Sequence, residues 1–197
     1  DQINRLRRNQ AQIQILPGQA AGDSIVAITN PYGSRFNYNV GVDHYGDAST
    51  GKLRYRGGGE ADNLLGFQES LGFSYIGTTD TNAVVFSGAV PFGFQTFSYT
   101  TSVSEYQQLI GDTALLYGRT FSQILGWNDV FARSATSRLS IDATLTKLST
   151  QRNVNDIDLA PENLTVVRVA LSGLGHFSAH NQPGALTAEF GIAQGLP

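Results

Sequence analysis

The sequence predicts an all-β fold: an antiparallel transmembrane β-barrel, of which this chain supplies about nine strands. Apolar and polar residues alternate strictly in about nine segments, most clearly over residues 137–146. Side chains alternate between the two faces of a strand, so one face there is apolar and the other polar. The apolar face carries Leu139, Ile141, Ala143 and Leu145, and the polar face carries Arg138, Ser140, Asp142, Thr144 and Thr146. The polar faces include charged residues, and the sequence offers no long helices to cover the apolar faces. This combination is typical of a membrane-spanning barrel.

Composition supports this prediction and excludes several classes of protein. Charged residues make up 15% of the 197 residues, which is low for a soluble surface. No apolar run approaches the 18 residues of a transmembrane helix, so any membrane crossing is made by strands. The chain has no cysteine, which excludes disulfides and thiolate metal sites, and its net charge of −3 gives no reason to expect a nucleic-acid partner. It opens within a helix-like segment and stops just after a strand, so we expect a part of a longer protein.

Residues 1–30 differ from the rest and predict the end of a small α+β module. Residues 2–10 look like the end of a helix, followed by strands over 11–16 and 24–28. Pro17-Gly18 breaks the first strand, and residues 19–23 form a turn. Residues 30–33 read as a linker to the second unit, residues 31–197.

The nine predicted strands follow in order from residue 35, each marked by an apolar stripe. The stripes lie within residues 36–42, 53–55, 71–75, 84–90, 97–103, 115–121, 139–145, 167–171 and 186–192. The sixth is less regular, because Arg119 falls on the same face as Leu115, Tyr117 and Phe121.

The predicted connections alternate in length, as expected when periplasmic turns are short and outer loops are long. Residues 62–66, 91–94 and 126–129 are expected as short turns, 151–163 as a long loop and 104–112 as a moderate one. Aromatic residues at strand ends suit a bilayer interface, although half-exposed soluble strands favour them too. These are Tyr32, Phe36, Tyr45, Phe92, Phe94 and Trp127.

The polar faces supply candidate pore-lining residues. Lys52, Arg54 and Arg56 alternate along one strand, and they form either a solvated sheet face or a basic inner wall. In a barrel they must face inwards, because Arg or Lys facing lipid costs about 2–4 kcal/mol at the midplane. The full candidate set is Arg35, Asn37, Asn39, Asp43, Lys52, Arg54, Arg56, Arg138, Asp142, Arg168 and Glu189.

Other motifs give no support for catalysis or a cofactor. His176 and His180 have the spacing of a helical metal site, but they fall in a predicted turn without a neighbouring carboxylate or thiol. No Gly-x-Ser-x-Gly sequence marks a nucleophile. The glycines at 57–59 lack the Lys-Ser/Thr of a phosphate loop, so we expect a strand bend or a close backbone approach. We predict no enzyme activity, no metal and no cofactor.

Several segments resemble the transporters of two-partner secretion, the haemolysin secretion/activation proteins of the ShlB/FhaC/HecB type. Asn4-Arg5-Leu6, Gln14-Ile15-Leu16-Pro17-Gly18 and Gly22-Asp23-Ser24-Ile25-Val26 look like the end of the second POTRA domain. Val42-Asp43-His44-Tyr45-Gly46 and Ser49-Thr50-Gly51 are similar to the first barrel hairpin. Asp62-Asn63-Leu64-Leu65-Gly66 and Val90-Pro91-Phe92-Gly93-Phe94 look like the next two turns. The family's pore loop, with its Val-Arg-Gly-Tyr-like motif, has no counterpart in these residues.

The resemblance implies a monomeric sixteen-stranded barrel in the bacterial outer membrane, with two periplasmic POTRA domains and a plugging N-terminal helix. Such a protein exports one large β-helical exoprotein, a haemolysin, adhesin or contact-dependent toxin, without nucleotide hydrolysis. Its partners are the unfolded exoprotein and outer-membrane lipid. A client could pair with POTRA strand edges by β-augmentation. The candidate client-facing residues are Ile13, Ile15, Leu16, Ile25 and Ile28.

Two alternatives remain open at this stage. A barrel-assembly type of outer-membrane insertase would share the barrel and the POTRA module. A soluble β-sandwich binding module would share the alternation and would purify without detergent.

Overall fold

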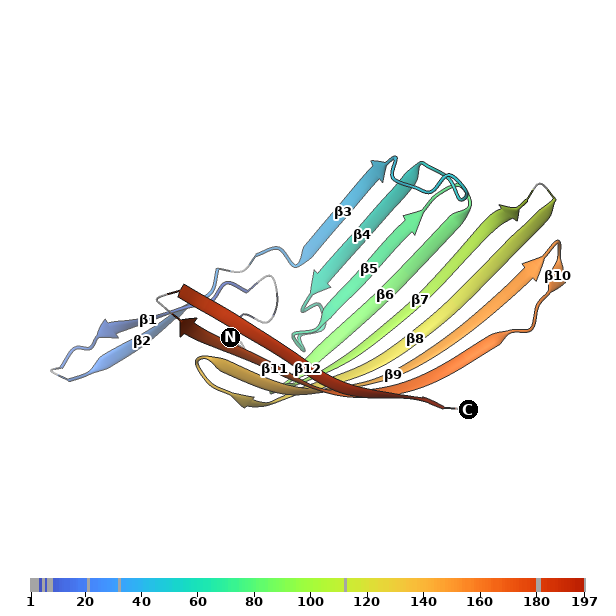
Figure 1. Ribbon diagram of the computed structural model, residues 1–197. Coiled ribbons are helices and arrows are strands. Elements are labelled where there is room, and N and C mark those ends of the chain that lie inside the picture. Colours follow the sequence, from blue (N-terminus) through green and yellow to red (C-terminus); the bar gives the residue numbers. More distant parts are fainter. Residues whose placement is uncertain are drawn as a thin grey trace.

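The computed structural model describes residues 4, 6, 9–20, 22–31, 33–111, 113–179 and 182–196. It contains two antiparallel sheets (Figure 1). A hairpin of β1 (Gln12–Pro17) and β2 (Ser24–Thr29) projects to one side of a large curved sheet. Most of the helix expected over residues 2–10 lies outside the described residues. Within the described part of the chain, no helix has the length and apolar character needed to span a membrane.

Nine antiparallel strands lie side by side in the large sheet, which confirms the predicted fold class and number of strands. Chain neighbours pair throughout, in the order β12-β11-β9-β8-β7-β6-β5-β4-β3, and the short β10 pairs with β9. The strands are β3 (Phe36–Asp43), β4 (Arg54–Asp62), β5 (Ser70–Gly77), β6 (Thr81–Phe92), β7 (Gln95–Ile110), β8 (Ala114–Arg133), β9 (Ser137–Val154), β10 (Ile157–Asp158), β11 (Glu162–Ala179) and β12 (Gln182–Leu196).

The register places each strand's apolar residues on one common face. Residues directly opposite each other in an antiparallel pair share a face. Val40 therefore begins a row that continues through Tyr75, Val84, Val103 and Phe121. This convex face leaves large apolar side chains exposed, with Tyr38 and Val40 both 87% exposed. Because the sheet is a single layer, few side chains are buried, and the apolar ones among the described residues are Leu6 and Ala170.

Strand length differs more across the sheet than loop length does. β3 and β5 have 8 residues each, whereas β7, β8 and β9 have 16, 20 and 18. A barrel strand needs about 9–11 residues to span a bilayer, so the long strands extend well beyond one. Measured along its strands, the sheet is consequently short at β3–β5 and tall at β7–β11 (Figure 1).

Three predicted connections are therefore wrong. Residues 126–129 lie inside β8, and its turn is at 134–136, where the Ser134 N–H donates to the Ser137 carbonyl at 2.8 Å. Asn128 is a residue type that favours turns, but its side chain lies on the polar face of the sheet, opposite Asp142, and can therefore be part of a long strand. Most of 104–112 belongs to β7, and β9 extends to Val154. β9 then turns tightly into β10 through Asn155 and Asp156, both at positive φ (48° and 62°).

The expected turn after β4 is confirmed and has an internal scaffold. Residues 63–69 reverse the chain with Asn63, Gly66 and Gln68 at φ of 54°, 89° and 57°. Glu69 is 1% exposed, and its carboxylate accepts the backbone N–H groups of Leu65 at 2.6 Å and Phe67 at 3.1 Å. The turn presents Leu65 and Phe67, about two-thirds exposed, at the end of the sheet.

Candidate functional site: the concave polar wall

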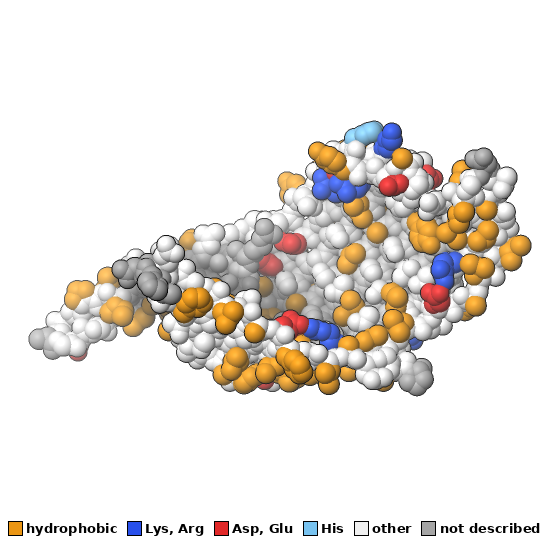
Figure 2. Space-filling model, in the orientation of Figure 1, with side chains coloured by type: hydrophobic (Ala, Val, Ile, Leu, Met, Phe, Trp, Pro, Cys, Tyr) orange, Lys and Arg blue, Asp and Glu red, His pale blue; other side chains and the backbone are white. Residues whose placement is uncertain are grey.

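The concave face of the large sheet is polar and is built largely from small residues. A hollow of about 490 Å³ is lined mainly by residues at concave-face positions, namely Asn37, Asn39, Gly58, Glu60, Gly72, Ser74, Val85 and Ser87. Figure 2 shows a hollowed surface that is mostly uncharged, with acidic and basic side chains in a few small groups. A Cβ at Gly58 would lie 2.6 Å from Oδ1 of Asn39 and 3.3 Å from the Phe73 carbonyl oxygen, so the tightest approach at 57–59 comes from a side chain and not, as expected, from backbone. The wall therefore combines little side-chain bulk with polar chemistry.

The first charged group joins β3 to β4 where the two strands meet the 44–53 connection. Asp43 Oδ1 accepts from Arg54 Nε at 2.9 Å, and Asp43 Oδ2 lies 2.8 Å from a terminal nitrogen of Arg56. The Asp43 side chain is 11% exposed, whereas that of Arg56 is 53% exposed. One carboxylate thus holds two cations, and the group carries net positive charge. Lys52, predicted in the strand, lies in the connection before β4.

A second group crosses three strands. Asp142 on β9 accepts the Asn128 amide N–H from β8 at 2.7 Å and the Ser172 hydroxyl from β11 at 3.1 Å. Ser140 and Ala170 beside it are 3% and 2% exposed, so this is the most tightly packed part of the wall. Sequence analysis selected Asp142 but missed Asn128, because it placed that residue in a turn. The signal available in the sequence was the alternation of the strand, because Gly126 and Asn128 continue its series of inward-facing positions.

Two further ion pairs join neighbouring strands. Arg168 on β11 pairs with Glu189 on β12, and Arg152 on β9 pairs with Glu162 on β11. Arg138 lies on the same face at the start of β9, opposite Arg133 in the register. Asn37 and Asn39 face the hollow, and Arg35 precedes β3, where its carbonyl accepts the Asp62 N–H at 2.9 Å. Except for Arg35 and Lys52, all the candidate pore-lining residues therefore lie on concave-face positions of the strands.

The lower end of β4 adds an acidic position that the sequence did not single out. Asp62 is 6% exposed, and its Oδ2 has no hydrogen-bond partner among the described residues. Leu6, also 6% exposed, lines a hollow of about 280 Å³ there with Glu60, Asp62 and Ser70. Leu6, which precedes β1, therefore lies against the concave wall at its near end.

The β1–β2 hairpin separates the candidate client-facing residues into two sets. Ile13 pairs with Ile28 and Ile15 with Val26, so these four share one face. Leu16 pairs with Ile25 on the opposite face. All six are exposed, from 44% at Leu16 to 75% at Ile15. Each strand has one unpaired edge, because β1 and β2 hydrogen-bond only with each other among the described strands.

The histidine motif does not form a site in the described part of the chain. His176 lies within β11 opposite Ala185, so the turn expected around it is wrong; a strand continues there because the whole segment pairs in register with β12. His180 lies outside the described residues. Among the described residues, no group of three or more His, Cys, Asp or Glu side chains could hold a metal ion.

Comparison with known proteins identifies the family. The family described as haemolysin secretion/activation protein ShlB/FhaC/HecB matches residues 22–197. The chain belongs to this family. It is 30% identical over 185 residues to the hemolysin transporter protein HpmB of Proteus mirabilis, covering 88% of this chain and 33% of HpmB. It is 28% identical over 209 residues to the hemolysin transporter protein ShlB of Serratia marcescens, covering 100% of this chain and 37% of ShlB.

A solved structure of a similar protein shares the fold. CdiB from Escherichia coli superimposes with a TM-score of 0.84 at 26% identity, covering 100% of this chain and 38% of CdiB. The chain thus spans about a third of the length of these relatives. The resemblance derived from the Leu-Pro-Gly and Asp-Asn-Leu-Leu-Gly segments is confirmed.

Proposed function

We propose that this chain is part of a bacterial outer-membrane transporter that exports a large exoprotein, a haemolysin, adhesin or contact-dependent toxin, in two-partner secretion. One observation carries the proposal. A nine-stranded sheet has an apolar convex face and a polar concave face, in a fold similar to that of CdiB. Relatives named outer membrane transporters support the location in the outer membrane. Their names also indicate transport as the activity.

Residues 1–30 are proposed as the end of the second POTRA domain, in the periplasm, and residues 31–197 as the first nine barrel strands. The apolar face with Ile13 and Ile15 suits packing against the rest of that domain. Among the described strands, β3 and β12 each leave an unpaired edge, and an open edge cannot face lipid. We infer that strands elsewhere in the full-length protein pair with both edges and close a sixteen-stranded, monomeric barrel.

The concave wall would serve as the inner wall of the export path. An extended polypeptide carries many backbone dipoles and some charges, which a polar lumen can solvate. The partners that three acids of this wall already have limit strong, lasting attachment, because Asp43 and Glu189 are ion-paired and Asp142 is hydrogen-bonded. Small residues such as Gly58 and Gly72 leave room along the wall. Transport needs no nucleotide, cofactor or enzymatic step in this scheme.

Capture of the client would begin on the β1–β2 hairpin. The unpaired edge of either strand can accept an extended client by β-augmentation. A photo-crosslinker at Leu16 reports on β1, and one at Ile25, directly opposite, reports on β2. A crosslink to the exoprotein at one position and not the other identifies the edge. Crosslinks at neither position would exclude capture on this hairpin.

The test of the function is a secretome comparison between the parent strain and one lacking the full-length gene. We expect selective loss of one very large secreted or surface protein, with other outer-membrane proteins at normal levels. General loss of barrel proteins would instead indicate an assembly factor. No change in either would refute the export proposal and favour a soluble binding module.

The inner wall is tested with single cysteines, because this chain has none of its own. Asn39→Cys and Val40→Cys are neighbours on β3 that face opposite sides. In intact full-length protein in vesicles, a water-soluble thiol reagent should label position 39 and largely spare position 40. Equal labelling at both positions would refute the assignment of the concave wall to a water-filled lumen.

A further inference from the structure

On the convex face of β9, the apolar stripe ends partway along the strand. On β9 the convex residues are Leu139, Ile141, Ala143 and Leu145, and then Lys147, Ser149, Gln151 and Asn153. The concave face of β9 changes in the opposite sense, from polar to partly apolar, because it includes Leu148 and Val154 toward the end of the strand. The convex face of β9 is thus suited to hydrocarbon up to Leu145 and to a polar environment from Lys147 onward.

Lys147 stands in a polar row at this boundary. Its direct cross-strand neighbours are Gln123 on β8 and Thr165 on β11, and Thr101 on β7 continues the row. Its neighbours along β9 on the same face are Leu145 and Ser149. The side chain is exposed, and no carboxylate occurs among these described neighbours. Lys147 therefore carries an outward-facing positive charge without a counter-ion from the sheet.

Arg119 supplies a second outward cation on the adjacent strand. It is exposed, and its cross-strand neighbours are Glu105 on β7 and Gln151 on β9. Glu105 is the one nearby acid, and its Oε2 accepts the Tyr117 hydroxyl at 3.0 Å. No ion pair joins Arg119 to Glu105 among the described residues. Strand rise and spacing put the Cα atoms of Arg119 and Lys147 about 14 Å apart.

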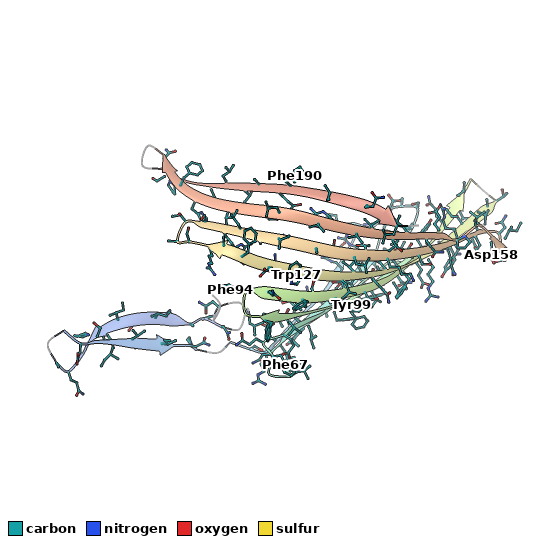
Figure 3. The ribbon with its side chains drawn as sticks, turned by 90° about the horizontal axis from the view of Figure 1, so that it is seen from below. Phe67, Phe94, Tyr99, Trp127, Asp158 and Phe190 are labelled. Atoms are coloured by element: carbon teal, nitrogen blue, oxygen red, sulfur yellow. The ribbon has the colours of Figure 1, made fainter. Side chains whose placement is uncertain are left out.

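The two cations lie on the side of the sheet remote from β1 and β2. Figure 3 places Asp158, at the tip that β9 leads to, far from the hairpin, whereas Phe67 and Phe94 lie at the near end. With the hairpin in the periplasm, the boundary at Lys147 faces the outer leaflet. This sidedness rests on the proposed function.

We propose that Lys147 and Arg119, with Gln123 and Thr165, bind the phosphate groups of lipopolysaccharide in the outer leaflet. A lysine or arginine facing lipid is costly at the midplane and nearly free at the interface, so both side chains belong at the headgroup level. Ammonium and guanidinium groups bind phosphate through charge-assisted hydrogen bonds, and the amide and hydroxyl add neutral ones. A glycolipid with more than one phosphate can contact both cations.

The test uses purified full-length protein in phosphatidylcholine nanodiscs with graded amounts of lipopolysaccharide, and native mass spectrometry counts the bound copies. Each cation near an anionic surface contributes about fivefold in affinity. Lys147→Gln with Arg119→Gln should therefore weaken binding by roughly 25-fold. Arg138→Gln, on the concave face, is the matched control and should bind like the parent. The charge-preserving pair Lys147→Arg and Arg119→Lys should retain most of the affinity.

Three results would overturn the proposal. These are equal binding by the parent and the glutamine double variant, equal binding of dephosphorylated lipopolysaccharide, and equal binding of phosphatidylglycerol in its place. The last would assign the cations to phospholipid. Binding is measured without any client, so its failure leaves the export proposal standing. An unchanged secretome, in turn, would refute the export proposal and would not alter the binding result.

Discussion

Glu69 is the position at which a single substitution should most clearly disturb the turn after β4. Its side chain is 1% exposed and accepts two backbone N–H groups, from Leu65 and Phe67. Its own carbonyl accepts the Asn63 N–H at 2.7 Å. Glu69→Ala removes both side-chain acceptors and leaves the main-chain bond. The turn holds Asn63 and Gln68 at positive φ, so the lost bonds are ones that fix an otherwise unfavourable backbone.

The magnitude follows from the two lost bonds. A hydrogen bond to a charged group contributes about 1.5–3 kcal/mol, but Leu65 and Phe67 are largely exposed and their freed N–H groups can recover water. We therefore expect Glu69→Ala to lower the free energy of unfolding by about 2–4 kcal/mol. Glu69→Gln keeps one carbonyl oxygen as an acceptor, so its free energy of unfolding should lie between those of the parent and Glu69→Ala. Gln68→Ala, at an exposed neighbouring site, should change little.

The assay is urea unfolding of full-length protein refolded into phospholipid vesicles, followed by the gel mobility of the folded barrel. The reasoning would be refuted if Glu69→Ala unfolded at the same urea concentration as the parent. Burial raises the pKa of Glu69, but backbone N–H groups, that of Leu65 foremost, outweigh this and hold the pKa below its ordinary range. The contribution of Glu69 should be complete above the unfolded pKa of about 4.3 and disappear as the pH falls through the folded pKa. The gap between parent and Glu69→Ala should close in acid accordingly.

Three further experiments test the faces and the wall. Leu145→Arg lies on the convex face, which we propose faces lipid, and should cost about 2–4 kcal/mol. Its neighbour Thr146→Arg lies on the concave face, the proposed lumen side, and should fold. Equal folded fractions in the outer membrane would contradict the face assignment. In Gly118→Val the new side chain should clash with the Tyr106 ring that covers this glycine, which should lower the free energy of unfolding by about 1–3 kcal/mol. Adding Tyr106→Ala to the same chain should relieve the clash. Urea midpoints would report both changes. Asp142→Ala removes the acceptor of two side chains and should cost about 1–3 kcal/mol, so an unchanged urea midpoint would show that water replaces it fully.

The limits of sequence reasoning are clearest on β8. The segment with Gly126, Asn128 and Asp129 consists of residue types that favour turns. A prediction from sequence takes account of such local preferences alone. In the structure the strand continues because β7 and β9 pair with it on both sides and Asn128 finds Asp142 across the sheet. Arg119 shows the converse: its irregular position is visible in the sequence, but only the register shows that it lies between Glu105 and Gln151.

Local alternation was enough to predict the class of fold, the number of strands and the face of every candidate pore-lining residue except Arg35 and Lys52, because strand periodicity is a local property of successive side chains. The sequence also held enough paired motifs to indicate the family. Only the tertiary structure decided how long the strands are, that Asn128, Asp142 and Ser172 meet, and that Asp62 is buried beside Leu6. Those features depend on cross-strand register, which joins residues far apart in the chain and follows from the pairing of whole strands.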